Sequence, residues 1–231
     1  MTEPNPGSDE WLALVREDIV DPARPIVDPH HHLWQRPGST YMLDELWGDT
    51  ESGHNVQKTV FVECHSAYRT DGPERMRPLG ETRFVAEIAE ASASGDGATI
   101  AGIVGHADLT LGEAVEEVLA AHTAAGAGLF RGIRHAGAHT EVPEELMIPG
   151  RAPEGLYQST EFQNGVRTLG RLDLTYDTWQ YHYQLPELTE LARSCPDTIM
   201  IIDHFSTPIG VGRFAGRREE IFDQWKTDFA E

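Results

Sequence analysis

Six short apolar segments recur along the chain, and they constrain its fold more than any other feature of the sequence. They are rich in β-branched residues and lack the period-two alternation of strands that have one face in water. The segments are 26–34, 58–66, 99–109, 128–137, 172–178 and 198–206. Nearly continuous apolar runs of this kind predict parallel strands that are buried on both faces.

Helical patterns lie between these segments. In 80–92, for example, Phe84, Val85 and Ile88 fall on one face of a helix. Similar patterns occupy 111–126, 160–172, 185–197 and 217–231. Strands that alternate with helices indicate βαβ units and a parallel sheet. The pattern leaves two architectures open, a (β/α) barrel and a doubly wound sheet.

The two ends of the chain carry separate expectations. Residues 1–25 are predicted to form an N-terminal extension, in which the apolar pattern from Trp11 to Val20 predicts a short helix. At the other end the sequence stops at Glu231 without a Gly, Asn or Pro stop signal. An eight-stranded barrel typically needs about 250 residues. If the fold is such a barrel, we expect 26–231 to form about six of its eight βα units and to lack the last two.

The charge balance excludes one large class of partner. The chain has 38 acidic and 18 basic residues and a formal net charge of -20, whereas nucleic-acid backbones are bound by clustered Lys and Arg. No secretory signal opens the sequence, and no apolar run approaches the ~20 residues of a membrane span. We expect a cytoplasmic protein that binds neither nucleic acid nor membrane. Its two distant cysteines, Cys64 and Cys195, are expected to be reduced.

Three histidines sit at predicted carboxyl ends of strands, where α/β domains build their sites. His30 and His32 are two residues apart, so on an extended strand they project to the same side. Such a pair can bind one divalent ion, because imidazole suits Zn, Mn or Fe. The alternative is a pair of hydrogen-bonded or surface histidines. His204 follows the last apolar run and is a third candidate site residue.

Four further residues are candidates, each with a structural alternative. A buried charge at Glu63 needs a partner, so Glu63 is either a site residue or part of an ion pair with Arg134 or Arg131. The planar fork of Arg134 suits a substrate carboxylate, or an ion pair in the mouth of a barrel. His182 is a candidate ligand or a partly exposed loop histidine, and His65 is a candidate for substrate binding or a structural strand-end histidine.

Several blocks of the sequence resemble the amidohydrolase superfamily, in particular the amidohydrolase-2 branch with its lactonases and related decarboxylases. The blocks are "VDPHHHLW", "VFVECHSAYRTDGPERMRPLGETRFV", "AGIVGHADLTLGEAVEEVLAAH", "FRGIRH" and "YHYQLPELTELARSCPDTIMIIDHFSTP". The resemblance implies a TIM-type barrel in which His30, His32 and His182 hold a divalent metal, Zn or Mn. It implies that His204 polarises a carbonyl or lies near the metal, while Glu63, Arg134 and His65 act on or bind the substrate.

The implied reaction is the attack of water on a lactone or amide carbonyl of a small, carboxylated substrate. In the family an aspartate at the end of strand eight binds the metal and acts as general base. The sequence ends before that strand, so no aspartate here is assigned the role. Two alternatives stay open, an inactive or partner-dependent truncated fragment and a metal-dependent decarboxylase. Some lactonases of this branch work without a metal, so metal dependence is open, as is a homo-oligomer.

Overall fold

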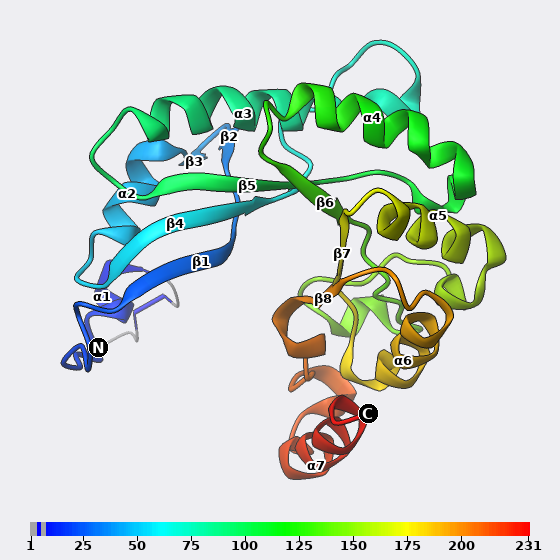
Figure 1. Ribbon diagram of the computed structural model, residues 1–231. Helices are drawn as coiled ribbons and strands as arrows, with labels where there is room; N and C mark the ends of the chain where they lie inside the picture. The colour runs from blue at the N-terminus through cyan, green and yellow to red at the C-terminus, as the bar shows by residue number, and fades with distance from the viewer. Residues whose placement is uncertain (1–3, 6–7) are drawn as a thin grey trace.

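A single six-stranded sheet organises the computed structural model, which describes residues 4–5 and 8–231 (Figure 1). All six strands are parallel, and they follow one another in chain order across the sheet. They are β1 (Pro25–His31), β4 (Asn55–Val62), β5 (Thr99–Gly105), β6 (Phe130–Arg134), β7 (Thr175–Thr178) and β8 (Met200–Ile202). Each overlaps one of the six predicted segments, although β4 begins three residues before its segment, so the parallel sheet is confirmed.

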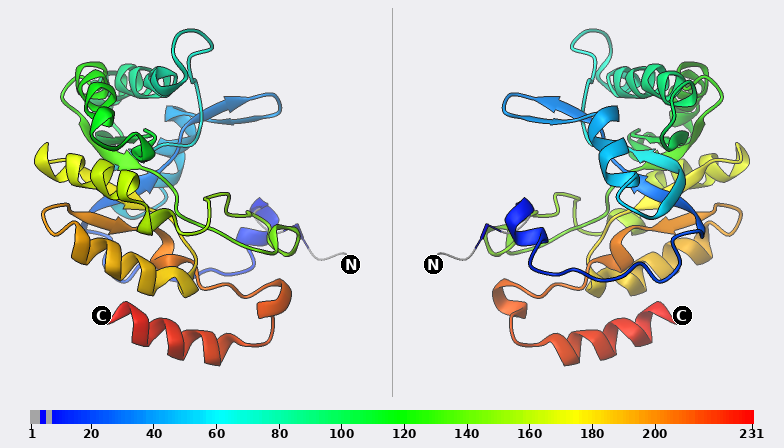
Figure 2. Two further views of the ribbon diagram at one scale, coloured as in Figure 1. Left: turned by 90° about the vertical axis from the view of Figure 1, so that its right-hand side faces the viewer. Right: turned by 90° about the vertical axis from the view of Figure 1, so that its left-hand side faces the viewer.

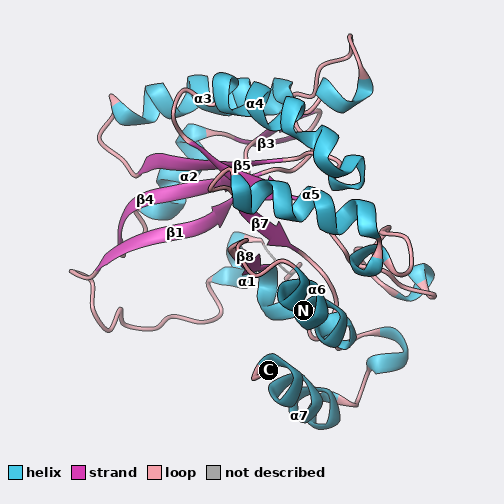
Figure 3. Ribbon diagram, turned by 45° about the vertical axis from the view of Figure 1, so that its right-hand side comes forward, coloured by secondary structure: helices cyan, strands magenta, loops and turns pink. Residues whose placement is uncertain are grey.

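The order of the strands decides between the two architectures. Right-handed crossovers that always step in the same direction place every connecting helix on the same face of the sheet. The helices pack along the outer face, and the sheet curls into a half-barrel (Figures 1 and 3). They are α3 (Leu79–Ala93), α4 (Glu116–Ala125), α5 (Thr160–Arg171) and α6 (Leu185–Ser194), with α7 (Arg218–Phe229) beside α6. The fold is therefore an incomplete (β/α) barrel.

Shorter elements fill the connections. Between β1 and β4 lie the antiparallel hairpin of β2 (Trp34–Arg36) and β3 (Ser39–Tyr41) and the helix α2 (Leu43–Thr50). The hairpin extends away from the body of the molecule (Figure 2). The 3-10 helices are η1 (Glu74–Met76), η2 (Leu109–Val115), η3 (Pro143–Glu145), η4 (Leu156–Gln158), η5 (His182–Gln184), η6 (Asp203–Ser206) and η7 (Gly212–Phe214).

The main core lies between the sheet and its helices. Ile133 of β6 and Tyr176 of β7 are fully buried against apolar residues of α4, α5 and α6. A second cluster joins Phe61 of β4 and Ile103 of β5 to Val85 of α3. The periodicities that predicted these helices therefore correspond to the faces that the helices bury. The two cysteines are both free, as expected.

The predicted helix from Trp11 to Val20 is wrong for most of its length. The helix α1 (Asp9–Leu12) ends at Leu12, and no regular element follows until β1. Leu14, Val15 and Val20 are 65%, 70% and 100% exposed, so the predicted apolar face has no surface to pack against. A short helix without such packing is marginal in water. Among the described residues, no helix combines the length and apolar character that crossing a membrane requires.

The predicted helix at 111–126 begins later than its pattern indicated. Residues Leu109–Val115 form the 3-10 helix η2, and α4 starts at Glu116. Gly112 lies inside η2 with a φ of 60°, in the left-handed region that favours glycine. The turn at Gly112 lets η2 lie against α5. The two elements are so close that α5 needs a glycine at the contact, Gly165. A methyl group at Gly165 of α5 would meet the carbonyl oxygen of Leu109.

We expect Gly165→Ala to lower the free energy of unfolding by about 1–3 kcal/mol, because the added methyl group overpacks this contact. Gly48→Ala in α2 is the matched control. Gly48 is also helical, but a methyl group there meets nothing within 4 Å. It should be neutral or stabilising by up to about 1 kcal/mol, since alanine has the higher helix propensity. Urea denaturation measures both, and equal effects would contradict the close packing of α5 on η2.

Candidate functional site

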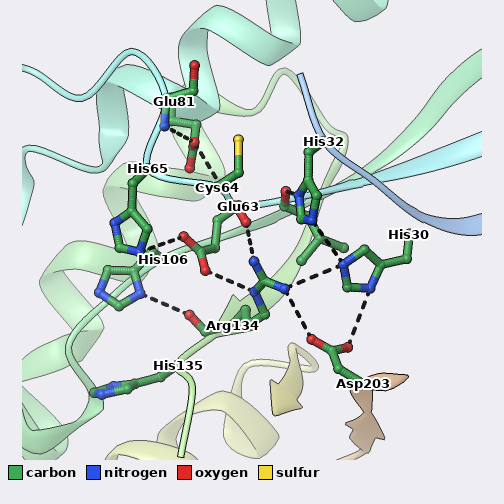
Figure 4. Close-up of polar contacts among 12 residues, drawn as sticks. His30, His32, Glu63, Cys64, His65, Glu81, His106, Arg134, His135 and Asp203 are labelled. Atoms are coloured by element: carbon green, nitrogen blue, oxygen red, sulfur yellow. Dashed lines mark hydrogen bonds and ion pairs between the residues drawn. The ribbon is translucent and has the colours of Figure 1, made fainter. Parts of the chain in front are cut away.

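Arg134, the last residue of β6, lies at the centre of the candidate site (Figure 4). Its Nε donates to Glu63 Oε1 at 2.9 Å, and its Nη1 donates to Asp203 Oδ2 at 3.3 Å. Nη2 donates to the main-chain carbonyl of Glu63. The ion pair between Glu63 and Arg134, one of the two interpretations of these charges, is therefore present. Through this pair and its second pair with Asp203, Arg134 links the end of β4 to the end of β8.

His30 and His32 lie beside this cluster and face each other. Their Nε2 atoms are 3.3 Å apart, as expected for two residues on the same side of a strand. His32 Nδ1 donates to the carbonyl of Val62 at 2.7 Å, so the Nε2 of a neutral His32 carries a lone pair. Arg134 Nη1 lies 3.4 Å from His30 Nε2, which makes that nitrogen an acceptor as well. Asp203 Oδ1 lies 3.6 Å from His30 Nδ1.

This arrangement fits one divalent metal ion. Two acceptor nitrogens 3.3 Å apart repel each other unless a cation lies close to both. The spacing is that of two nitrogens each about 2.0–2.1 Å from one tetrahedral Zn²⁺. His30, Asp203 and His204 also offer ligand atoms that all lie within 4.8 Å of one another. The carboxylate beside His30 Nδ1 and the carbonyl beside His32 Nδ1 match the outer partners of metal-bound histidines.

The charge states suit the same role. Burial lowers the pKa of His32, and the neighbouring charge of Arg134 lowers it further against the effect of the Val62 carbonyl. Burial likewise lowers the pKa of His204. Both rings are therefore neutral at pH 7, which is the form that binds metals. Burial opposes ionisation of Asp203, but His30 and Arg134 outweigh it and lower the pKa of Asp203.

His31 points away from the pair. It is buried and packs edge-on against Phe61, with 5.8 Å between ring centroids. Burial lowers its pKa to about 4, so the ring is uncharged at pH 7. Neither of its ring nitrogens has a hydrogen-bond partner among the described residues. His31 therefore belongs to the packing behind the site.

The structure places the remaining candidates at different distances from this cluster. His65 is largely exposed, and its Nε2 lies 3.5 Å from Glu63 Oε2. His182 is buried elsewhere: its Nδ1 accepts from the main-chain nitrogen of Ile209 at 3.4 Å, and its ring packs against Phe214. His182 is not part of the His/Asp group described above. Its role as a metal ligand stays a prediction that this geometry does not favour.

A cavity of about 710 Å³ opens over the cluster. His32, Glu63, His65, Arg134 and His204 line its polar end. Its volume lies within the range of small-molecule sites. Glu63 Oε2 is buried there without a hydrogen-bond partner among the described residues. Its nearest charged partner is His65, whose Nε2 lies 3.5 Å away. A buried carboxylate oxygen that lines a cavity without a hydrogen bond is a ready acceptor for a bound molecule.

Backbone strain marks the loop that carries His204. The φ angles of His204, Phe205, Ser206 and Thr207 are 51°, 51°, 58° and 41°, all in the left-handed region. The left-handed conformation costs roughly 1–2 kcal/mol for each non-glycine residue. Strain of this kind gathers at functional sites. No glycine in "DHFSTP" indicates this conformation, so the sequence does not reveal it.

Sequence reasoning missed the parts played by Asp203 and Asp177. The position of Asp203 at a strand end, just before His204, was the available signal. Asp177, in β7, is buried, and its Oδ1 accepts from the hydroxyl of Thr175 at 3.1 Å. Burial and the charge of Asp203 raise the pKa of Asp177 to about 7. Two carboxyl groups therefore meet near Arg134, of which one is ionised and the other is half-protonated at neutral pH.

Removal of the guanidinium of Arg134 should destabilise the folded protein. We expect Arg134→Met to lower the free energy of unfolding by about 3–5 kcal/mol at pH 7, because two buried carboxylates lose their partner. Arg131→Met is the control on the same strand. The guanidinium of Arg131 is exposed and donates to the carbonyls of Gly128 and Phe130. Its loss should cost less than about 1 kcal/mol. Chemical denaturation compares them, and similar losses would contradict the central role of Arg134.

The raised pKa of Asp177 predicts a pH dependence of stability. Between about pH 4 and pH 7 the unfolded chain has lost a proton that the folded protein retains, so this group lowers stability as pH rises. Asp177→Asn removes that slope. We compare the free energy of unfolding of this variant with that of the unsubstituted protein. The variant should gain stability relative to the unsubstituted protein from pH 4 to pH 7, by at most ~1.4 kcal/mol per pH unit. Above pH 7 the difference should stay constant. A flat difference would contradict it; Asp197→Asn, at an exposed site, controls for the lost charge.

Comparison with known proteins agrees with this fold. The model of the amidohydrolase family matches residues 27–223. The uncharacterized protein y4mH of Sinorhizobium fredii is 28% identical over 218 residues, which cover 84% of this chain and 67% of that protein.

Solved structures share the fold. An amidohydrolase from Burkholderia multivorans with bound zinc superposes with a TM-score of 0.58 at 20% identity, covering 87% of this chain and 63% of that one. A 2-pyrone-4,6-dicarboxylic acid hydrolase assigned in Pseudomonas putida gives a TM-score of 0.51 at 13% identity, covering 88% of this chain and 76% of that one. The chain thus spans less than two thirds of the zinc-bound structure, and its six strands correspond to an incomplete TIM-type barrel. The match over 27–223 extends from β1 into α7, and the chain belongs to the amidohydrolase family.

Proposed function

We propose that the protein is a hydrolase in which water attacks the carbonyl carbon of a lactone or an amide. The observation that carries the proposal is the convergence of His30, His32 and His204 with the carboxylates of Glu63 and Asp203, beside a cavity that His32, Glu63 and His204 line. Membership of the amidohydrolase family supports the reaction class.

His30 and His32 would hold a divalent metal, Zn or Mn, through their Nε2 atoms, with Asp203 or His204 as a further donor. Such an ion polarises a carbonyl and lowers the pKa of bound water. The guanidinium of Arg134 occupies part of this space, since its Nη1 lies 3.4 Å from His30 Nε2. Metal binding at this pair therefore requires Arg134 Nη1 to move toward Asp203. A reaction without metal would keep Arg134 in place.

Glu63 is positioned to handle the proton of the attacking water. Arg134 fixes its Oε1, and Oε2 faces the cavity without a hydrogen bond, 3.5 Å from His65 Nε2. As the water oxygen bonds to the carbonyl carbon, one proton passes to Glu63 Oε2. When the ring C–O or C–N bond breaks, the same proton passes to the leaving oxygen or nitrogen. A neutral His204 lines the same cavity and can donate a hydrogen bond to the carbonyl oxygen.

Metal content tests the ligand assignment. The protein is equilibrated with Zn²⁺ or Mn²⁺, dialysed and analysed by mass spectrometry of the metal. We expect one bound ion, and an affinity reduced at least tenfold in the double variant His30→Ala/His32→Ala, because both nitrogens that face each other are lost. His182→Ala should retain the ion. Loss of metal from His182→Ala alone would restore that residue as the ligand in place of the pair.

Hydrolysis is tested with the same protein on a panel of lactones and amides, with metal and with chelator. Glu63→Gln should lower kcat by at least 100-fold, because the amide cannot take up a proton. Release of carbon dioxide from unsaturated acids instead would favour a decarboxylase. Turnover by the 231-residue chain itself would contradict the alternative of an inactive or partner-dependent fragment. No turnover under any of these conditions would contradict the proposal.

A further inference from the structure

The cavity has little capacity for an anionic substrate. Among the described residues that line it, Arg134 is the one with a permanent positive charge. Four of its five N–H groups already donate, to Glu63, Asp203 and His30, and its side chain is 13% exposed. Two carboxylates thus face one guanidinium, in a chain of formal net charge -20. A substrate carboxylate would have to displace one of these buried acids from its partner.

The opposite side of the cavity is an apolar wall. Two loops build it, one after η3 and one after η6, on a floor of aromatic residues from the segment after β7. The wall comprises Leu146, Met147, Ile148, Trp179, Ile209 and Val211. Met147 and Ile148 are 91% and 71% exposed, so the wall reaches the entrance of the cavity. Exposed apolar residues that gather at a pocket mark a binding surface.

Hydrogen bonds hold this wall in shape. The hydroxyl of Tyr181 accepts from the main-chain nitrogen of Gly150 at 2.7 Å and donates to the carbonyl of Ile148 at 2.9 Å. Trp179 Nε1 donates to the hydroxyl of Thr207 at 2.8 Å, which fixes the second loop.

An ion pair joins the two loops, and a buried cluster lies beneath them. Arg213 Nη2 lies 3.0 Å from Glu145 Oε1. Beneath them Ala138, Tyr181 and Ile209 form a small buried cluster. A surface that is ordered before binding costs less to occupy.

We infer that the substrate is an uncharged lactone or amide that carries an apolar alkyl or aryl group. Its carbonyl lies at the histidine end of the cavity, and its apolar group lies on the wall of 146–148 and 209–211. This inference rests on the proposed function for the reaction, but its binding part does not require turnover. It replaces the carboxylated substrate that Arg134 suggested in the sequence, because the one N–H group that Arg134 has left cannot make the paired contact that a carboxylate takes.

Binding is measured first, with lactams that are not readily hydrolysed. Isothermal titration calorimetry compares a γ-lactam bearing an n-hexyl group with the same ring bearing a carboxymethyl group. We expect the hexyl lactam to bind at least tenfold more tightly, since buried methylene groups add affinity and the carboxylate meets Glu63 and Asp203. Equal or tighter binding of the carboxymethyl lactam would overturn the inference.

The wall is tested by Met147→Ser/Ile148→Ser, at two exposed positions whose replacement should not impair folding. This double variant should bind the hexyl lactam at least tenfold more weakly and the carboxymethyl lactam unchanged. Leu14→Ser/Val15→Ser is the matched control, because these neighbours are 65% and 70% exposed and lie in the N-terminal extension. Retained hexyl affinity in the Met147/Ile148 variant would contradict the assigned wall.

Turnover of the corresponding lactones separates this inference from the proposed function. Preferred hydrolysis of the carboxymethyl lactone would overturn the inference and leave the hydrolase standing. Tight binding of the hexyl lactam without hydrolysis of any lactone or amide would support the inferred ligand class and contradict the hydrolase. Absence of both binding and turnover would overturn both.

Discussion

The guanidinium of Arg134 is the constraint on which both the sheet and the site depend. It neutralises Glu63 after β4 and Asp203 after β8, and it donates to the main chain of Glu63. Buried carboxylates are tolerated only with such a partner. Asp203 in turn lies beside His30 of β1, so one arginine at the end of a central strand orders groups from both edges of the half-barrel. The fixed orientation of Glu63, with one oxygen engaged and one free, follows from the same contact.

Much of the fold could be predicted from the sequence, because buried parallel strands and amphipathic helices leave local patterns. Each of the six apolar segments overlaps a strand. The predicted helix face of Phe84, Val85 and Ile88 faces the core, where Val85 is fully buried. The helix from Trp11 was predicted wrongly, since local spacing does not reveal whether a face will find a partner. Leu14 and Val15 did not find one.

The site was less accessible to such reasoning. The pairing of His30 with His32 follows from strand geometry and was predicted. Whether Glu63 meets Arg134 or Arg131 depends on which carboxyl ends converge in space, and a charge 71 residues away leaves no local pattern. The role of His182 as a metal ligand was an implication of the family resemblance, but its ring contacts Ile209 and Phe214. The left-handed conformation of His204 could not be predicted, because no glycine in that segment indicates it.

The two edges of the sheet, β1 and β8, are in contact through side chains, whereas the strands of a closed barrel would be paired throughout. β1 and β8 share no pairing, and what joins them at the carboxyl rim is contact among the side chains of His30, Asp203 and His204. Main-chain hydrogen bonds hold neighbouring strands at a fixed spacing, whereas side chains rotate. These side-chain contacts add to the four paired strands that already connect β1 to β8. The side chains that form the candidate site therefore also form the contact between the two edges of the sheet, and a rotamer change at one of them would alter both.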